Sequence, residues 1–247
     1  MIEGVSPDLP HTGHLPPGRE GLLRIVRPIA RLALRAYWRI QVHGAEHVPD
    51  TGPVILAANH LALLDGPILV AITHRLTFAM AKQELFVGFG GRLLAQVGQI
   101  SLDRHRIDLH AMRRAIQVLR SDNVLAVFPE GVRVGGDVAF ARGGAAYLAM
   151  VVGAPVVPVA ILGTREPGQT KSQLPRRGAP IHVTFGPPIA VPARPWPRRK
   201  VEVAELTEVL RQRLADHVVA AQALTGLPLP GPPVPKAARA ARPRDRK

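Results

Sequence analysis

A histidine and an aspartate five positions apart, His60 and Asp65, are the side chains of this sequence best suited to acid–base chemistry. A carboxylate bonded to one imidazole nitrogen fixes the tautomer and leaves the other nitrogen free to take a proton. The four residues between them are apolar and can turn the chain so that the carboxylate meets the ring. The pair therefore predicts a general base with its orienting acid, and a plain structural role for His60 is the alternative.

The surrounding residues place this pair at the end of a strand. The uncharged run 54–58 predicts a buried strand, which ends at the polar residue Asn59. After the aspartate, Gly66-Pro67 predicts a turn. Open α/β sheets bind their ligands beyond the carboxyl ends of the strands, so the pair lies where such a fold carries its chemistry.

Charged side chains follow two other predicted strands. Asp103 and Arg104 come after one of them, and Glu130 and Arg133 come after the other. Arginine is suited to bidentate contact with a phosphate, so the set predicts a substrate that carries a phosphate and a hydroxyl to be deprotonated. Each arginine taken alone could instead be a surface or ion-pair residue.

Strands and helices alternate along the chain, which predicts an α/β fold: a single domain with a mainly parallel β-sheet flanked by helices. The expected strands are 40–42, 54–58, 76–80, 98–104, 124–128, 156–162 and 181–185. The expected helices are 68–73, 86–96, 107–120, 142–152 and 201–223.

The chain is expected to divide into four parts. A flexible arm (1–18) precedes amphipathic basic helices (19–39), the main folded domain follows (40–225), and a tail rich in Pro, Ala and Arg (226–247) is expected to be disordered. The apolar windows inside the main domain are expected to form its core rather than to span a membrane.

The segment 19–39 combines an apolar body with an arginine stripe. Pro28 is expected to divide it into two helical pieces. Such a stretch suits the surface of an anionic bilayer, and the alternative is a helix packed on its own domain with a solvated basic face. The arginines that recur every three or four residues are Arg24, Arg27, Arg31, Arg35 and Arg39.

Composition limits the classes of partner. The formal charge of +14, from 32 Lys and Arg against 18 Asp and Glu, predicts an anionic partner. The sequence has no cysteine, which excludes disulfides, thiolate nucleophiles and thiolate metal sites, and no other ligand set for a metal is evident. Aromatic residues are only 4% and no nucleic-acid recognition motif is visible, so a basic nucleic-acid-binding protein is a distant alternative.

Four segments in order resemble the motifs of the glycerolipid acyltransferases, most closely the bacterial 1-acyl-glycerol-3-phosphate acyltransferases. They are Asn59-His60 with Asp65, 98–104, 128–133 and 157–159. The resemblance covers about 40–188. The chain departs from the family pattern at Val132 and Val134, where Thr and Ser are usual, and at Ser101-Leu102 before the Asp-Arg pair. These departures leave the identity of the acceptor open.

The resemblance implies transfer of a fatty acyl group from acyl-CoA or acyl carrier protein to the free hydroxyl of a lysophospholipid. The first expectation is 1-acyl-sn-glycerol 3-phosphate, which would give phosphatidic acid; glycerol 3-phosphate, a lyso-ornithine lipid or another lysophospholipid are alternatives. His60 would take the proton from the hydroxyl, and Asp65 would hold the ring. No cofactor and no metal is implied, and the enzyme would lie on the cytoplasmic face of the cell membrane as a peripheral protein.

The resemblance also assigns residues to the acceptor. The residues implied to bind its phosphate and glycerol are Asn59, Arg104, Glu130, Gly131 and Arg133. Further candidates are Lys82, Asp103 and Arg142.

Overall fold

The structure, a computed structural model, describes residues 9–12 and 20–235, so most of the expected arm 1–18 lies outside the described residues. Strands alternate with helices as predicted. The strands are β1 (Arg39–His43), β2 (Val54–Ala58), β3 (Thr77–Lys82), β4 (Ile100–Leu102), β5 (Val124–Val127), β6 (Val156–Leu162) and β7 (Pro180–Phe185). The helices are α1 (Glu20–Tyr37), α2 (Asp65–Ile72), α3 (Gly88–Gln96), α4 (Leu109–Arg120), α5 (Gly144–Val152) and α6 (Lys200–Thr225), with 3-10 turns η1 (Ala45–His47) and η2 (Gln83–Leu85).

The strands form one sheet in the order β1-β7-β6-β2-β5-β3-β4. Neighbouring strands are parallel except for β6 and β7, so the predicted mainly parallel sheet is confirmed. The antiparallel pair is a feature that the sequence pattern did not indicate. Strand β2 lies between β5 and β6, and the carboxyl ends of these three parallel strands meet at one edge.

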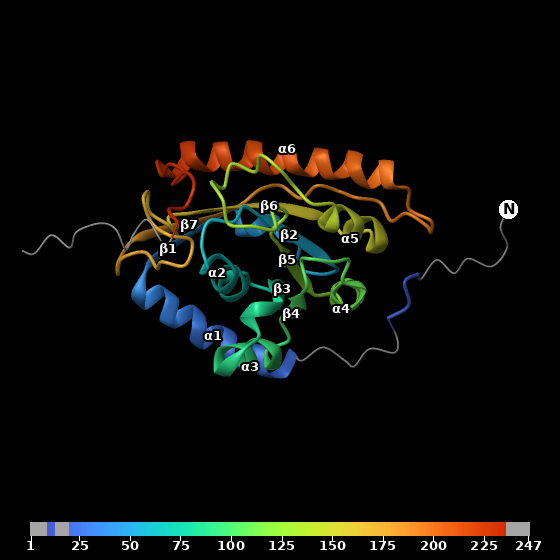
Figure 1. The fold of residues 1–247 in the computed structure, drawn as a ribbon, viewed down its shortest axis with the longest axis horizontal. Helices are drawn as coiled ribbons and strands as arrows, with labels where there is room; N and C mark the ends of the chain where they lie inside the picture. Colours follow the sequence, from blue (N-terminus) through green and yellow to red (C-terminus); the bar gives the residue numbers. More distant parts are fainter. Residues whose placement is uncertain (1–8, 13–19, 236–247) are drawn as a thin grey trace, which may run out of the picture.

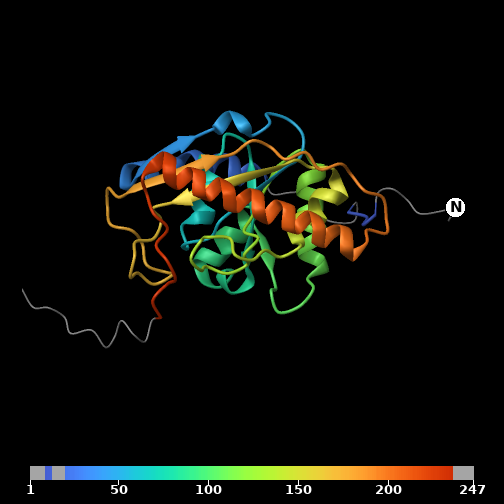
Figure 2. The ribbon, with the colours of Figure 1, turned by 90° about the horizontal axis from the view of Figure 1, so that it is seen from above.

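Helices cover both faces of the sheet because alternate residues of each strand point to opposite sides. In β2, Ile55 and Ala57 pack in a core that includes α4 and α5, whereas Leu56 and Ala58 pack in a core that includes α2. A third cluster joins β6 to α6. Figures 1 and 2 show α6 crossing one side of the sheet, with α1 and α2 on the opposite side.

Helix α1 runs unbroken through Pro28, so the predicted division into two helical pieces is wrong. Pro28 is exposed, and water can bind the carbonyl oxygen that loses its intrahelical donor there. The inner face of α1 packs on the domain through Leu23 and Leu34, while Ile25 and Ile29 are exposed. None of the helices within the described residues is long and apolar enough to cross a bilayer.

The chain keeps a defined path after α6. Leu227 and Leu229 pack against the cluster formed by α6 and β6. The predicted disorder is therefore wrong for 226–235, because these two leucines give a Pro-rich stretch apolar surface to bury. The remainder of the expected tail, 236–247, lies outside the described residues.

Candidate active site

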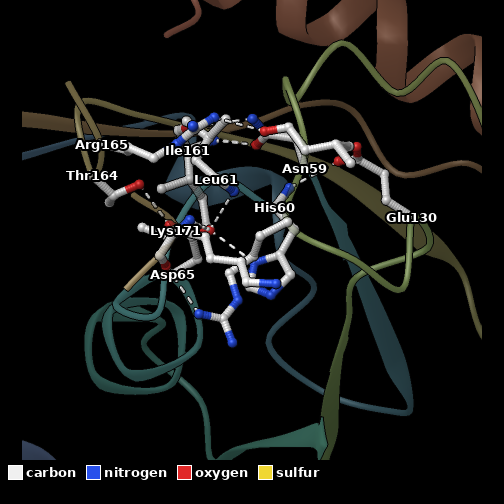
Figure 3. A network of polar contacts seen from close by, with 12 residues as sticks. Asn59, His60, Leu61, Asp65, Glu130, Ile161, Thr164, Arg165 and Lys171 are labelled. Atoms are coloured by element: carbon white, nitrogen blue, oxygen red, sulfur yellow. Dashed lines mark hydrogen bonds and ion pairs between the residues drawn. The ribbon is translucent and has the colours of Figure 1, made fainter. Parts of the chain in front are cut away.

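The aspartate closes a tight turn around the histidine. Nδ1 of His60 lies 2.9 Å from Oδ2 of Asp65. The same oxygen accepts the main-chain N–H of Leu61 at 2.6 Å (Figure 3). It also accepts the main-chain N–H of Ala62 at 2.8 Å. Because a buried carboxylate accepts this bond, Nδ1 carries the proton and Nε2 keeps the lone pair that a general base needs.

The turn ends by starting a helix. Asp65 is the first residue of α2, so Gly66 and Pro67 lie inside the helix, and the loop turn predicted at these two residues is wrong. Proline fits at this point because the first N–H groups of a helix have no intrahelical acceptor. The carboxylate also lies at the helix N-terminus, where a negative charge is favourable.

Asn59 ties the end of β2 to β6. Its Nδ2 donates to the main-chain oxygen of Ile161 at 3.1 Å, and its Oδ1 accepts the main-chain N–H of Ile161 at 2.7 Å. The side chain is fully buried, and both ends of its amide are occupied by protein. The implied role in substrate binding does not fit this placement, and Asn59 instead fixes where the chain leaves the sheet.

Glu130 lies beneath the same turn. Its Oε1 accepts the main-chain N–H of His60 at 2.9 Å, and the residue is 1% exposed. Burial raises the pKa of Glu130 to about 7, with smaller contributions from the nearby carboxylates of Asp137 and Asp65. Glu130 is not part of the cavity lining described below, so the expected contact with the acceptor does not fit, and it supports the histidine instead.

His60 lines a cavity of about 560 Å³. The wall is mainly apolar and comes largely from α1, α2, α3 and β3, with side chains such as Leu23, Val70 and Leu94. The imidazole stacks on Phe128 with 4.2 Å between the ring centroids. Within the described residues Nε2 has no protein hydrogen-bond partner, so this nitrogen is available to a substrate in the cavity.

Arg104, Arg133 and Lys82 contribute cationic groups to the same cavity. Arg104 donates a hydrogen bond to the main-chain oxygen of Gly131, and Arg133 donates one to that of Lys171 at 3.0 Å. Gly131 also lines the cavity and has φ +66°, a backbone conformation that residues other than glycine rarely adopt. The structure thus brings the histidine, both arginines and this glycine together, as the strand-end argument predicts.

The three further candidates for substrate contact, Lys82, Asp103 and Arg142, occupy different places relative to the cavity. Lys82 lines the cavity and forms an ion pair with the exposed Glu84. Asp103 pairs with Arg106 at 2.9 Å and lies outside the lining. Arg142 is exposed and also lies outside it. Only the lysine therefore remains a candidate for contact with a substrate.

Thr164 and Arg165 are site residues that the sequence analysis missed. The Thr164 hydroxyl donates to Oδ1 of Asp65 at 2.6 Å (Figure 3). Arg165 is buried and its Nη2 donates to the main-chain oxygens of Val134 at 2.7 Å and Gly231 at 2.6 Å. Both residues follow β6, so the rule applied to the other strand ends would have indicated them.

The fold is that of a known acyltransferase structure. The crystal structure of the 1-acyl-sn-glycerophosphate acyltransferase from Thermotoga maritima is similar with a TM-score of 0.59, over 81% of this chain and 80% of that one, at 22% identity. A family model described as Acyltransferase matches residues 39–162, half of the chain. The chain therefore belongs to the Acyltransferase family, which confirms the resemblance drawn from the four motifs.

Curated relatives point the same way. An uncharacterized protein of Mycobacterium tuberculosis H37Rv is 31% identical over 162 residues, 58% of this chain and 42% of that protein. The 1-acyl-sn-glycerol-3-phosphate acyltransferase of Borreliella burgdorferi is 32% identical over 131 residues, 51% of this chain and 52% of that protein. The Bacillus subtilis protein of the same name is 28% identical over 179 residues, 72% of this chain and 87% of that protein. The chain thus spans about half the length, or less, of the first two relatives.

Proposed function

We propose that this protein is an O-acyltransferase that moves a fatty acyl group from a thioester to the free hydroxyl of a lysophospholipid. The observation that carries the proposal is the position of His60, whose ring is held by Asp65 and lines an apolar cavity. Arg27, Arg104 and Arg133 line that cavity, which suits an acceptor with a phosphate and a fatty chain. The names of the Borreliella and Bacillus relatives support the same reaction.

In the proposed reaction His60 acts through Nε2. This nitrogen takes the proton of the acceptor hydroxyl as the oxygen attacks the thioester carbonyl. A new C–O bond forms and the C–S bond breaks, and the imidazolium returns the proton to the departing thiolate. Asp65 stays ionised and holds the ring throughout. The step needs no covalent enzyme intermediate and no cofactor, and the donor is acyl-CoA or acyl carrier protein.

The acceptor we favour is 1-acyl-sn-glycerol 3-phosphate, with phosphatidic acid as the product. Arg133, Arg104 and Lys82 would bind its phosphate, with Gly131 allowing close approach of the main chain. Val132 and Val134 are exposed on the loop that carries Arg133, so they offer no hydroxyl to an acceptor headgroup. This observation favours, as the second candidate, the same chemistry on glycerol 3-phosphate, a lyso-ornithine lipid or another lysophospholipid.

The test is a thiol-release assay with oleoyl-CoA and a panel of these acceptors. Loss of the general base in His60→Ala should lower kcat by at least about a hundredfold. His105→Ala is the matched control, since this histidine is exposed and lies outside the cavity lining, and it should retain activity. A His60→Ala protein with full thioester-dependent acylation would refute the proposal.

The proposed enzyme works at an anionic membrane surface, on its cytoplasmic face. Ile25 and Ile29 of α1 are more than 60% exposed, and Phe89 of α3 is 85% exposed; both helices line the cavity. The exposed Arg24, which pairs with Glu20, and the exposed Arg35 would contact lipid phosphates. Arg27 instead lines the cavity and donates to the main-chain oxygen of His74.

Sedimentation with vesicles tests this contact. The protein should pellet with vesicles that contain phosphatidylglycerol, and the double substitution Ile25→Gln with Ile29→Gln should weaken binding by about tenfold, as expected from the apolar area withdrawn from lipid. A matched double substitution on the outer face of α6, Val209→Gln with Val219→Gln, should leave binding unchanged. Equal losses in both variants would argue against a specific membrane face.

A further inference from the structure

We propose that Thr164 is a positioning residue for the proton-transfer pair, because its hydroxyl fixes the carboxylate of Asp65 in the plane in which that carboxylate meets the His60 ring. The inference rests on the proposed function, since it concerns the step in which His60 takes a proton. Thr164 belongs to none of the four motif segments and follows β6, a strand that is not adjacent to α2 in sequence.

The two oxygens of Asp65 have different partners. Oδ2 accepts three hydrogen bonds from the turn itself, those of His60, Leu61 and Ala62. Oδ1 accepts the Thr164 hydroxyl at 2.6 Å, and within the described residues this is its only protein donor. Both side chains are fully buried, so without the hydroxyl one oxygen of a buried carboxylate would lack a protein donor.

The hydrogen bond from Thr164 prevents a rotation of the Asp65 carboxylate that the three bonds to Oδ2 allow. Three donors that meet at Oδ2 hold that atom in place but leave the carboxylate able to pivot about it. A donor at Oδ1, supplied from a different strand, fixes the plane of the group. Donors prefer to lie near the plane of the acceptor, so a fixed plane keeps the ring of His60 in one orientation. The ring orientation in turn sets where Nε2 points in the cavity.

The residues on either side hold Thr164 in place. Gly163 has φ +85°, and a Cβ at this position would collide with the main-chain oxygen of Pro180, so the turn after β6 requires glycine. On the other side, Arg165 anchors the chain through its hydrogen bonds to Val134 and Gly231. Burial lowers the pKa of Arg165, and its interaction with the charge of Asp65 acts in the opposite direction.

Thr164 is not part of the cavity lining, and this separates positioning from substrate binding. Thr164→Val keeps the volume but removes the donor, and it should lower kcat by about tenfold or more, the usual cost of a lost hydrogen bond to a charged group. The KM values for thioester and acceptor should stay within about twofold of the wild type, because the cavity wall is unchanged. Thr164→Ser restores the donor and should recover kcat to within about threefold.

Thr73→Val is the matched control. Thr73 is also buried, and its hydroxyl donates to Leu69 at the far end of α2, so the substitution removes the same group without touching Asp65. Its kcat should equal that of the wild type. Unfolding midpoints are measured for all variants, and if Thr164→Val does not fold, Thr164→Ala takes its place with the same expectation.

The outcomes are distinct. A wild-type kcat in Thr164→Val would overturn the inference while leaving the proposed function standing. Equal losses in the Val and Ser variants, or KM values that rise with the loss of kcat, would also overturn it, because they indicate a disturbed site rather than a missing donor. A wild-type protein that transfers no acyl group to any acceptor would refute the proposed function itself, and the inference with it.

Discussion

The turn that carries His60 and the cationic wall of the cavity are held by different kinds of contact. In the turn, Asp65 is buried and accepts four hydrogen bonds, three of them from its own turn. In the wall, Arg104 and Arg133 are partly exposed, and within the described residues each donates one hydrogen bond, to a main-chain oxygen. A guanidinium has five N–H donors, so most of them remain for a ligand.

This difference separates two properties of the proposed enzyme. The turn is constrained from several sides, so a substitution there should change the rate of the chemical step. The wall is free to accommodate an acceptor, so a substitution there should change which acceptor binds and how tightly. A substitution in the turn that mainly raised KM, or one in the wall that mainly lowered kcat, would contradict this division.

The largest effect expected from the wall is that of Arg133→Met. Removing a guanidinium that binds the acceptor phosphate should raise the KM for lysophosphatidic acid by about ten- to a hundredfold. The kcat should stay within about threefold, because Arg133 makes no hydrogen bond to His60 or Asp65. For monoacylglycerol, which has a hydroxyl but no phosphate, KM should not change. Steady-state kinetics with the two acceptors measures the contrast.

Arg213→Met is the matched control for this prediction. Arg213 is an arginine of α6 that is exposed and lies outside the cavity lining. Its substitution should leave KM for both acceptors unchanged. An equal rise of KM in the two arginine variants would mean that net positive charge, rather than the cavity wall, attracts the acceptor.

Sequence reasoning predicted most of the fold, because continuous apolar runs such as β2 and β5 are strong signals of buried parallel strands. It also predicted the His60–Asp65 pair, whose members are close in sequence. It could not place Thr164 against Asp65, since that bond joins residues 99 positions apart. Contacts of this kind depend on the strand order, which the pattern of strands and helices does not fix.

For two other residues the structure differs from the sequence-based prediction in where the side chain points. The sequence indicated that Asn59 and Glu130 belong to the site, and both do. Their side chains, however, point into the protein and hold β6 and the turn rather than a substrate. The end of a strand indicates that a residue lies near the site. Whether its side chain faces the cavity or the protein interior depends on the main-chain groups that it can bond, which belong to other segments.

Glu130→Gln tests whether Glu130 supports the His60 turn rather than binding the acceptor, and it should have the smallest effect on activity. The amide oxygen of glutamine can still accept the main-chain N–H of His60, so kcat and both KM values should stay within about twofold. If the carboxylate instead bound the acceptor, the substitution would raise the acceptor KM, and Glu130 would belong with the wall.

The same substitution should alter how stability depends on pH. Burial raises the pKa of Glu130 from 4.5 to about 7, so between these values the folded protein holds a proton that the unfolded chain has released. The free energy of unfolding of the wild type therefore falls, relative to the variant, as the pH rises from 4.5 to 7, by up to about 3 kcal/mol. Urea unfolding of both proteins at pH 5 and pH 8 measures the difference, and the other titrating groups, being common to both, cancel. A difference that is the same at both pH values would contradict the raised pKa of Glu130, because this group would then be protonated to the same extent in the folded and the unfolded chain.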